Sequence, residues 1–150
     1  MDMISPFIEA MKDVMPQLGF STVEIISQQT VEPKLLNKGV MILVGIMGDI
    51  KGSFICNMSE ESAKQITSVL MMGLPITELD EMTQSAIAEL SNMLSANATI
   101  KFTKYNKHMD ISPPTLMLGK GSSLRVTTKI VSRIATTVNG IPVDLLIAAE

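Results

Sequence analysis

Apolar residues recur at helical spacing near the start of the chain. The positions that share this spacing are Phe7, Ala10, Met11, Val14 and Leu18. Ser5 can cap the first turn. Pro6 suits the first helical position, because an N–H at that position has no partner within the helix and its absence in proline costs nothing. The pattern predicts an amphipathic helix that begins at Ser5 and ends between Pro16 and Gly19.

Three segments rich in apolar and β-branched residues then predict strands: 22–31, 40–47 and 50–58. The last two are separated by a turn at Gly48-Asp49, which is typical of an antiparallel hairpin. Gly45, Gly48 and Gly52 are interpreted as turn glycines. They lie between strands and not before a helix, so they do not form a phosphate-binding loop.

Two more helices follow in the middle of the chain. Ser59 is a good N-cap for a short helix that ends before Gly73, and Asp80 is a good N-cap for a longer helix that continues to about Phe102. In the longer helix the stripe predicted to face the core comprises Met82, Ala86, Leu90, Met93 and Leu94.

The last third of the chain predicts further strands. Residues 104–114 are polar and turn-like, and Asn139-Gly140 is a strong hairpin-turn dipeptide. Strands are expected at 115–118, in one or two pieces within 124–138, and at 141–149. Short connections favour antiparallel pairing. The sequence therefore predicts one α+β domain, residues 1–150, with two longer helices and one short helix packed on an antiparallel sheet.

Composition agrees with a single globular domain. The 150 residues are 46% hydrophobic and 18% charged, which is enough to build a core and argues against disorder. The mean hydropathy is +0.32, yet the most apolar run, 40–47, is too short to span a membrane. We expect no signal peptide, no membrane association and a cytoplasmic location. The single cysteine, Cys56, is expected to be a reduced, buried residue.

Charge and side-chain chemistry exclude several function classes. The net charge is −3 and the isoelectric point is about 5.2, which argues against nucleic acid as a partner. One histidine and one cysteine cannot supply a metal cluster or a Cys/His catalytic pair. His108 is interpreted as a loop residue. The segment 119–123 lacks the spacing of a phosphate loop and is interpreted as a hairpin turn.

One pattern on the long helix can carry chemistry. Ser85, Glu89 and Asn92 lie within roughly 60° of one another at about 100° per residue, so they share one exposed face. A carboxamide both donates and accepts hydrogen bonds, so Asn92 can hold a water molecule for in-line attack on phosphorus. The carboxylate of Glu89 can bind a cation, such as a lysine, at the same site. A simple solvated helix face would also carry such a pair.

The sequence resembles the CheX family of chemotaxis phosphatases, which is related to CheC and FliY. Residues 85–93, Ser-Ala-Ile-Ala-Glu-Leu-Ser-Asn-Met, are similar to the [DS]-x-x-x-E-x-x-N helix of that family. Pro114 corresponds to a later proline of the motif, with 21 residues between it and Asn92 where the family has some 22. Residues 5–10 resemble the opening helix of the family and residues 44–53 resemble its central hairpin, so the likeness covers essentially the whole chain.

This resemblance implies a CheX-like phosphatase domain that dephosphorylates a CheY-type response regulator. Asn92 would position the hydrolytic water, and Glu89 would pair with the active-site lysine of the receiver. Ser85 and Pro114 would support the motif, with Pro114 shaping the start of a strand. The chain would need no cofactor, because Mg²⁺ belongs to the receiver. A single copy of the motif points to CheX, which forms a homodimer through its sheet.

Two other function classes stay open at this point. Related folds occur in flagellar switch proteins, so the chain could be a receiver-binding module of chemotaxis or flagellar-switch type that does not catalyse hydrolysis. It could also be a structural dimer whose helix face is incidental. The presence of Asn92 beside Glu89 favours catalysis, because a pure docking face needs no water-orienting amide.

Overall fold

The computed structural model describes residues 2–149 and contains three α-helices and one antiparallel main sheet. The helices are α1 (Ser5–Gln17), α2 (Glu60–Leu70) and α3 (Glu81–Phe102), with a 3-10 turn, η1, at Thr103–Tyr105. The strands are β1 (Val23–Val31), β2 (Lys34–Leu36), β3 (Val40–Gly48), β4 (Gly52–Met58), β5 (Met109–Ile111), β6 (Thr115–Leu118), β7 (Ser123–Arg125), β8 (Val131–Val138) and β9 (Ile141–Ala149).

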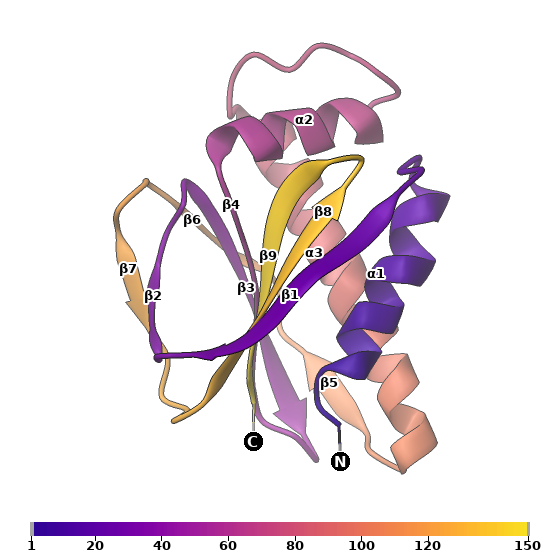
Figure 1. Ribbon diagram of the computed structural model, residues 1–150, viewed down its shortest axis with the longest axis vertical. Helices are drawn as coiled ribbons and strands as arrows, with labels where there is room; N and C mark the ends of the chain where they lie inside the picture. Colours follow the sequence, from indigo (N-terminus) through magenta and orange to yellow (C-terminus); the bar gives the residue numbers. More distant parts are fainter. Residues whose placement is uncertain (1, 150) are drawn as a thin grey trace.

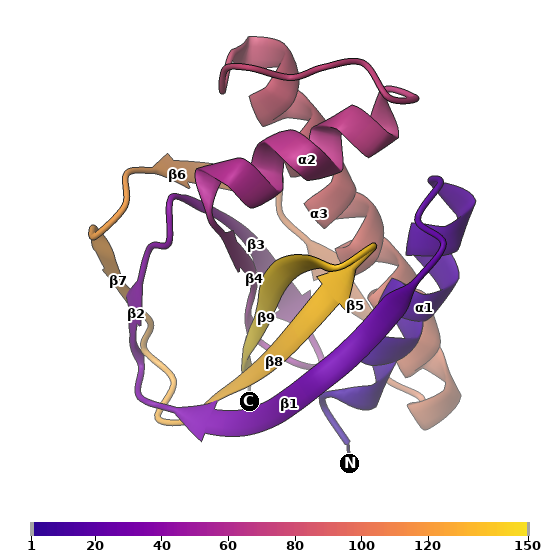
Figure 2. The same cartoon turned by 45° about the horizontal axis from the view of Figure 1, so that its top comes forward.

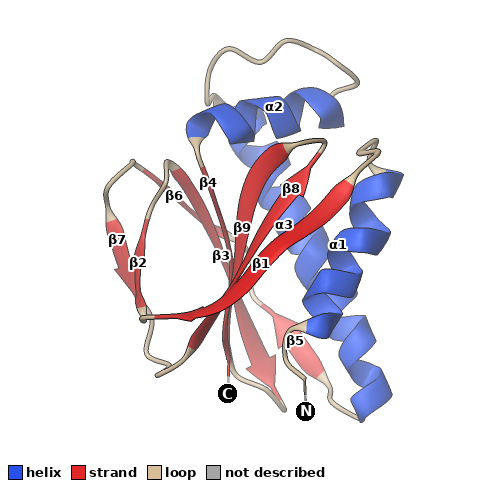
Figure 3. Ribbon diagram, viewed as in Figure 1, coloured by secondary structure: helices blue, strands red, loops and turns tan. Residues whose placement is uncertain are grey.

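The main sheet has seven strands in the order β1-β8-β9-β4-β3-β5, with β6 also paired to β3. Every pairing within it is antiparallel. Helices α1 and α3 lie on one face, and α2 lies across one end of the sheet (Figures 1 and 2). The predicted α+β class with an antiparallel sheet is confirmed, as the separation of helices and strands in Figure 3 makes plain.

Two hydrophobic clusters lie on opposite faces of this sheet. The larger one fills the space between the sheet and the helices, where the Phe7 ring stacks on Phe54 at a centroid distance of 4.8 Å and meets the edge of Phe102 at 5.8 Å. The smaller one includes Leu35 and Leu146 and lies on the other face, beneath the two-stranded sheet of β2 and β7. Figure 1 shows β2 and β7 standing apart from the main sheet, on the side away from α1 and α3.

Several sequence predictions hold at the level of single residues. The side chain of Ser59 accepts a hydrogen bond from the N–H of Ser62, as an N-cap should. Asn139 and Gly140 both have positive φ, 50° and 75°, which is the conformation of a tight hairpin turn. Cys56 is buried and unpaired. Within residues 2–149 every helix is too short or too polar to cross a lipid bilayer.

Other predictions need correction. Ser5 is not the N-cap of α1, because Ile4 occupies that position and the Asp2 carboxylate accepts hydrogen bonds from the N–H groups of Ile4 and Ser5. Gly45 is not a turn residue: it lies inside β3, where its N–H donates to Ser112 Oγ.

The strand count is also larger than expected. The segment 104–114 contains β5 as well as turns, and β2 was not predicted, whereas β7 and β8 correspond to the two pieces allowed within 124–138. Residues 119–123 do form a turn, but it joins β6 of the main sheet to β7 of the small sheet and is therefore not a hairpin.

Candidate functional site

The beginning of α3 is fixed by its own sequence. The Asp80 side chain accepts hydrogen bonds from the N–H and the hydroxyl of Thr83, both at 2.9 Å. These bonds, the backbone one first, hold the pKa of Asp80 below its usual value. Gln84 Nε2 donates to the Leu79 carbonyl at 2.7 Å. The preceding loop is therefore tied to the first turn of the helix.

Small polar residues let α3 approach the core closely. Ser91 and Ser95 are buried, and their hydroxyls donate to carbonyls one turn earlier in the same helix, at 3.1 and 2.7 Å. Because these hydroxyls are satisfied inside the helix, they can be buried without an unpaired polar group. At the C-terminal end of α3, Lys101 of the helix forms an ion pair with Asp13 of α1, and Lys104 of the following turn η1 forms one with Glu9 of α1. The helix is thus held along its length against the rest of the domain.

The opposite side of α3 carries the residues predicted to act together. Ser85 and Glu89 are exposed and Asn92 is half-buried; we call these three residues the ridge. Their positions span about 10 Å along the helix axis, and Glu89 and Asn92 are about 4.5 Å apart in rise. Other side chains of α3 form hydrogen bonds within the helix or to the loop before it. The three ridge side chains form none with the described residues. The ridge is therefore available to another molecule.

An apolar hollow borders one side of the ridge. It has a volume of about 220 Å³ and is lined by Glu89 together with apolar side chains from α2, from α3 and from the residues that cap the C-terminal ends of α1 and α2. Those side chains are Leu18, Leu70, Met71, Ala86, Leu90 and Met93. We call this the Met93 hollow. The hollow therefore offers an apolar surface beside the Glu89 carboxylate, and a side chain of a partner can pack on it.

A second hollow, of about 350 Å³, lies on the other side of the ridge, between α3 and β6. Its lining includes Ser85 and Leu116, so we call it the Leu116 hollow. Pro114 lies immediately before β6 and does not line either hollow. The structure thus places Ser85 with Glu89 and Asn92 on one helix, and places Pro114 at the beginning of the strand beside it.

The core stripe predicted for α3 is partly wrong. Met82 and Met93 are exposed to 43% and 36%, whereas the buried positions include Thr83, Ile87 and Ser91. The exposed methionines flank the ridge, and Met72 and Leu74 from the loop after α2 are exposed as well. This apolar border was missed because methionine in a helical repeat predicts burial. The hydroxyl residues of this helix were the sequence signal that could have identified the buried face, because a hydroxyl that donates to a carbonyl of its own helix can be buried.

The metal and nucleophile chemistry of the described chain is sparse. Residues 2–149 bring together no group of three His, Cys, Asp or Glu side chains that could hold a metal ion. Burial raises the pKa of the Cys56 thiol to about 12, against the opposing effect of a hydrogen bond with Ser91. His108 is exposed in the loop before β5, where its N–H donates to Asp49.

Comparison with known proteins places this geometry in a family. Residues 40–136 match the model of the family described as "Chemotaxis phosphatase CheX". A curated protein of Thermotoga maritima, "CheY-P phosphatase CheX", is 37% identical over 86 residues, which span 57% of this chain and 56% of that protein. The chain thus matches just over half of the length of this relative.

Solved structures share the fold over nearly the whole chain. A CheC-like superfamily protein from Shewanella sp. PV-4 superposes with a TM-score of 0.88 at 19% identity, covering 100% of this chain and 99% of the other. The CheX–CheY–BeF3–Mg complex from Borrelia burgdorferi gives a TM-score of 0.74 at 23% identity, covering 99% and 98%. These likenesses establish the fold. Because the family model spans well over half of the chain and includes the ridge, the chain belongs to the chemotaxis phosphatase CheX family.

Proposed function

We propose that this protein is a phosphatase that removes the phosphoryl group from the active-site aspartate of a CheY-type receiver domain. The observation that carries the proposal is the ridge, on which the exposed Glu89 and the half-buried Asn92 lie one turn apart on a firmly held helix, with no hydrogen bond from either side chain to another described residue. The family match, the Thermotoga relative named as a CheY-P phosphatase and the Borrelia complex of CheX with CheY support it.

In this mechanism Asn92 acts on the water molecule. Its carboxamide accepts a hydrogen bond from the water and donates another to an oxygen of the phosphoryl group, which aligns the water with the bond that breaks. The water oxygen forms a bond to phosphorus as the bond between phosphorus and the aspartate oxygen breaks. The products are the aspartate carboxylate and inorganic phosphate. Asn92 does not act as a base, and its contribution is the orientation of the water.

Glu89 acts on the receiver itself. Its carboxylate pairs with the active-site lysine of the receiver, one turn away from Asn92 on the same face. This pair docks the ridge in one register, so that the carboxamide meets the phosphoryl group. Ser85 keeps the face small enough for close approach, and Pro114 fixes the backbone where β6 begins beside α3. The Mg²⁺ of the reaction belongs to the receiver, and this chain contributes no cofactor.

We further propose that the protein works in the cytoplasm as a homodimer formed through its main sheet. Strand β1 lies at one end of the strand order and pairs with β8 on one side. The other side of such a strand carries backbone groups that a second copy can pair with. Light scattering behind a size-exclusion column tests the dimer, since a monomer at micromolar concentration would contradict it.

The decisive experiment measures loss of phosphate from a CheY-type receiver prepared with Mg²⁺ and a small-molecule phosphodonor. Wild-type protein should accelerate the loss, and Asn92→Ala should reduce the acceleration by about 100-fold while receiver binding survives. Glu89→Ala should weaken both binding and turnover. Gln65→Ala, which removes an exposed carboxamide from α2, is the matched control and should behave like wild type.

Two outcomes would contradict the proposal. Retained turnover in Asn92→Ala would remove the water-positioning role from this residue. Binding of the receiver without acceleration by wild-type protein would favour the receiver-binding module that does not catalyse hydrolysis.

A further inference from the structure

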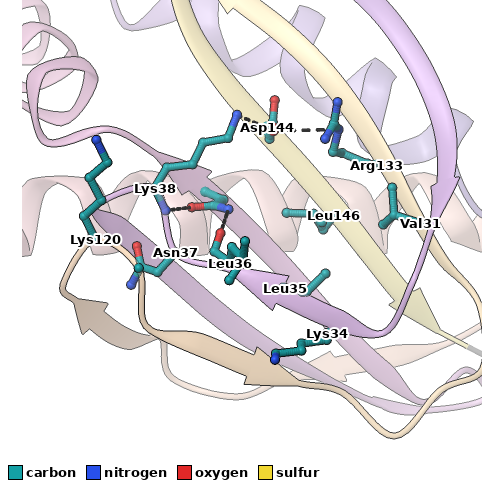
Figure 4. A pocket seen from close by; sticks show the side chains of 12 residues that line it. Val31, Lys34, Leu35, Leu36, Asn37, Lys38, Lys120, Arg133, Asp144 and Leu146 are labelled. Atoms are coloured by element: carbon teal, nitrogen blue, oxygen red, sulfur yellow. Dashed lines mark hydrogen bonds and ion pairs between the residues drawn. The ribbon is translucent and has the colours of Figure 1, made fainter.

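A third hollow, which shares no lining residue with the ridge, lies between the β2–β7 ribbon and the main sheet (Figure 4). It is on the face of the sheet opposite α1 and α3 and has a volume of about 500 Å³. Small-molecule sites in proteins commonly have volumes of about 300–1,000 Å³. We call it the β2–β7 hollow. Its size suits a molecule with one or two rings.

The floor of the β2–β7 hollow is apolar. Leu35 and Leu146 are buried members of the smaller hydrophobic cluster, and Val31 packs against the same cluster. In Figure 4 these three side chains lie together on one side of the opening. They form a continuous surface on which an apolar body can lose contact with water.

The wall of the hollow is cationic. Asp144 on β9 is buried, and its Oδ2 lies 2.7 Å from Lys38 Nζ and 3.8 Å from Arg133 Nε. Lys34 and Lys120 also line the opening, so the lining holds four cations and one carboxylate in a chain whose net charge is −3. The local charge is therefore opposite in sign to that of the whole protein. Such a concentration of one sign in a cleft attracts an anion.

The neutral polar side chains of the hollow are already engaged. Asn57 accepts a hydrogen bond from the N–H of Lys38 and donates one to the carbonyl of Leu36. Asn37 is likewise bonded, to Gly39 and Met117. These amides shape the hollow and leave recognition to the cations.

Arg133 has unused hydrogen-bonding capacity. Its Nε atom is buried and makes no hydrogen bond with the described residues, since Asp144 lies beyond hydrogen-bond distance. A buried donor without a partner is costly, and a negatively charged oxygen would satisfy it. The same carboxylate holds Lys38 and Arg133 side by side before any ligand arrives.

We propose that the β2–β7 hollow binds a small organic anion, with its apolar body on Val31, Leu35 and Leu146 and its acidic group against Arg133 and Lys38. This site is separate from the ridge and does not depend on the phosphatase proposal. The combination of an apolar floor with an excess of cations selects an amphipathic anion over a neutral apolar compound and over inorganic phosphate.

A pair of fluorescent compounds tests this selection. The probe is 8-anilinonaphthalene-1-sulfonate, and its neutral counterpart is N-phenyl-1-naphthylamine, which has the same rings without the sulfonate. The folded protein should bind the sulfonate at least about tenfold more tightly, because a charged hydrogen bond is lost with the neutral compound. Amide chemical-shift changes should map to β2, β9 and Gly121. Equal affinity for both compounds, or shifts confined to the ridge, would overturn the proposal.

Substitutions locate the acidic group. Arg133→Gln should weaken sulfonate binding about tenfold. The double variant Lys34→Gln/Lys120→Gln changes only exposed side chains, so it should fold normally, and it should weaken binding about threefold. Arg125→Gln is the matched control and should bind like wild type, because Arg125 pairs in register with Lys34 but does not line the hollow.

The alternative occupant is a second copy of the chain. Light scattering of the same samples distinguishes the two cases. If a second copy covers the hollow, wild-type protein would not bind the sulfonate, and the lysine double variant would shift the dimer to monomer. That result would overturn the proposal, whereas sulfonate binding with unchanged oligomeric state would support it.

Discussion

Burial of Cys56 makes the stability of the fold sensitive to alkaline pH. The thiol lies on β4 beneath α3 and is 2% exposed. Burial raises its pKa from 9.0 to about 12. The folded protein therefore holds the thiol proton more tightly than the unfolded chain does. This stabilising contribution is fully present below pH 9 and is lost as the pH rises from 9 towards 12.

The size of the loss follows from the two pKa values. Each pH unit above the ordinary pKa of the thiol costs about 1.4 kcal/mol until the pKa of the folded state is reached. At pH 10, one unit above 9.0, the free energy of unfolding should therefore fall by about 1.4 kcal/mol from this group alone.

Urea unfolding of wild type and Cys56→Ala at pH 8 and pH 10, followed by circular dichroism, measures this effect. At pH 8 the variant should be less stable by about 1–2 kcal/mol, because it loses buried contacts and leaves a small cavity. Every other side chain is the same in the two proteins, so the difference between them isolates the thiol. At pH 10 the gap should narrow by about 1.4 kcal/mol. A gap that stays constant would refute the reasoning, since the thiol would then have equal pKa values folded and unfolded.

Three further predictions test other parts of the structure. Gly52→Ala should lower the free energy of unfolding by about 3 kcal/mol or more, because a Cβ there would lie 2.0 Å from the Ala148 carbonyl oxygen. In the same urea experiment Gly121→Ala should lower it by only about 1 kcal/mol, because a Cβ at that position would meet nothing within 4 Å. Met93→Ser should weaken receiver docking about fivefold without changing the maximal rate, and a lower rate at saturation would contradict a purely docking role. Asp80→Ala should lower the Tm at pH 7, and the difference in Tm from wild type should shrink as the pH falls below 3.8. A difference in Tm that does not depend on pH would show that the charge of the carboxylate is not what caps the helix.

The long strands and the helix starts were predictable because local sequence determines them. The continuous apolar run in β3 and the Asn139-Gly140 turn before β9 act within a few residues of where they lie. The strands β2, β5 and β7 have three residues each, and β2 and β7 pair with each other across more than half of the chain. The predicted stretch 124–138 did include most of β7, but nothing local marks β2 or β5 as strands, because the stability of such short segments comes from pairing with a distant one.

Helix α3 shows both the strength and the weakness of reasoning from spacing. The mutual placement of Ser85, Glu89 and Asn92 follows from helix geometry alone, and the structure places all three on the side of the helix that faces away from the core. Which face is buried depends on packing, and here hydroxyl residues such as Ser91 are buried while Met93 is exposed. A hydrophobicity pattern predicts the opposite for both residues, with Ser91 exposed and Met93 buried. The cations of the β2–β7 hollow come from segments far apart in the sequence, so no spacing rule could have assembled them.

The ridge is convex, with only shallow hollows at its sides. Many enzymes surround their substrate with walls that exclude bulk water, and a convex surface cannot do this by itself. Under the proposed function, the enclosure around the reacting phosphorus must therefore come from the substrate protein, which needs an opening wide enough for one face of a helix about 10 Å across. A free acyl phosphate or phosphate monoester provides no such enclosure. Substrate selectivity would then be a matter of shape on the partner's side, and the protein should leave small phosphate esters untouched even at high concentration.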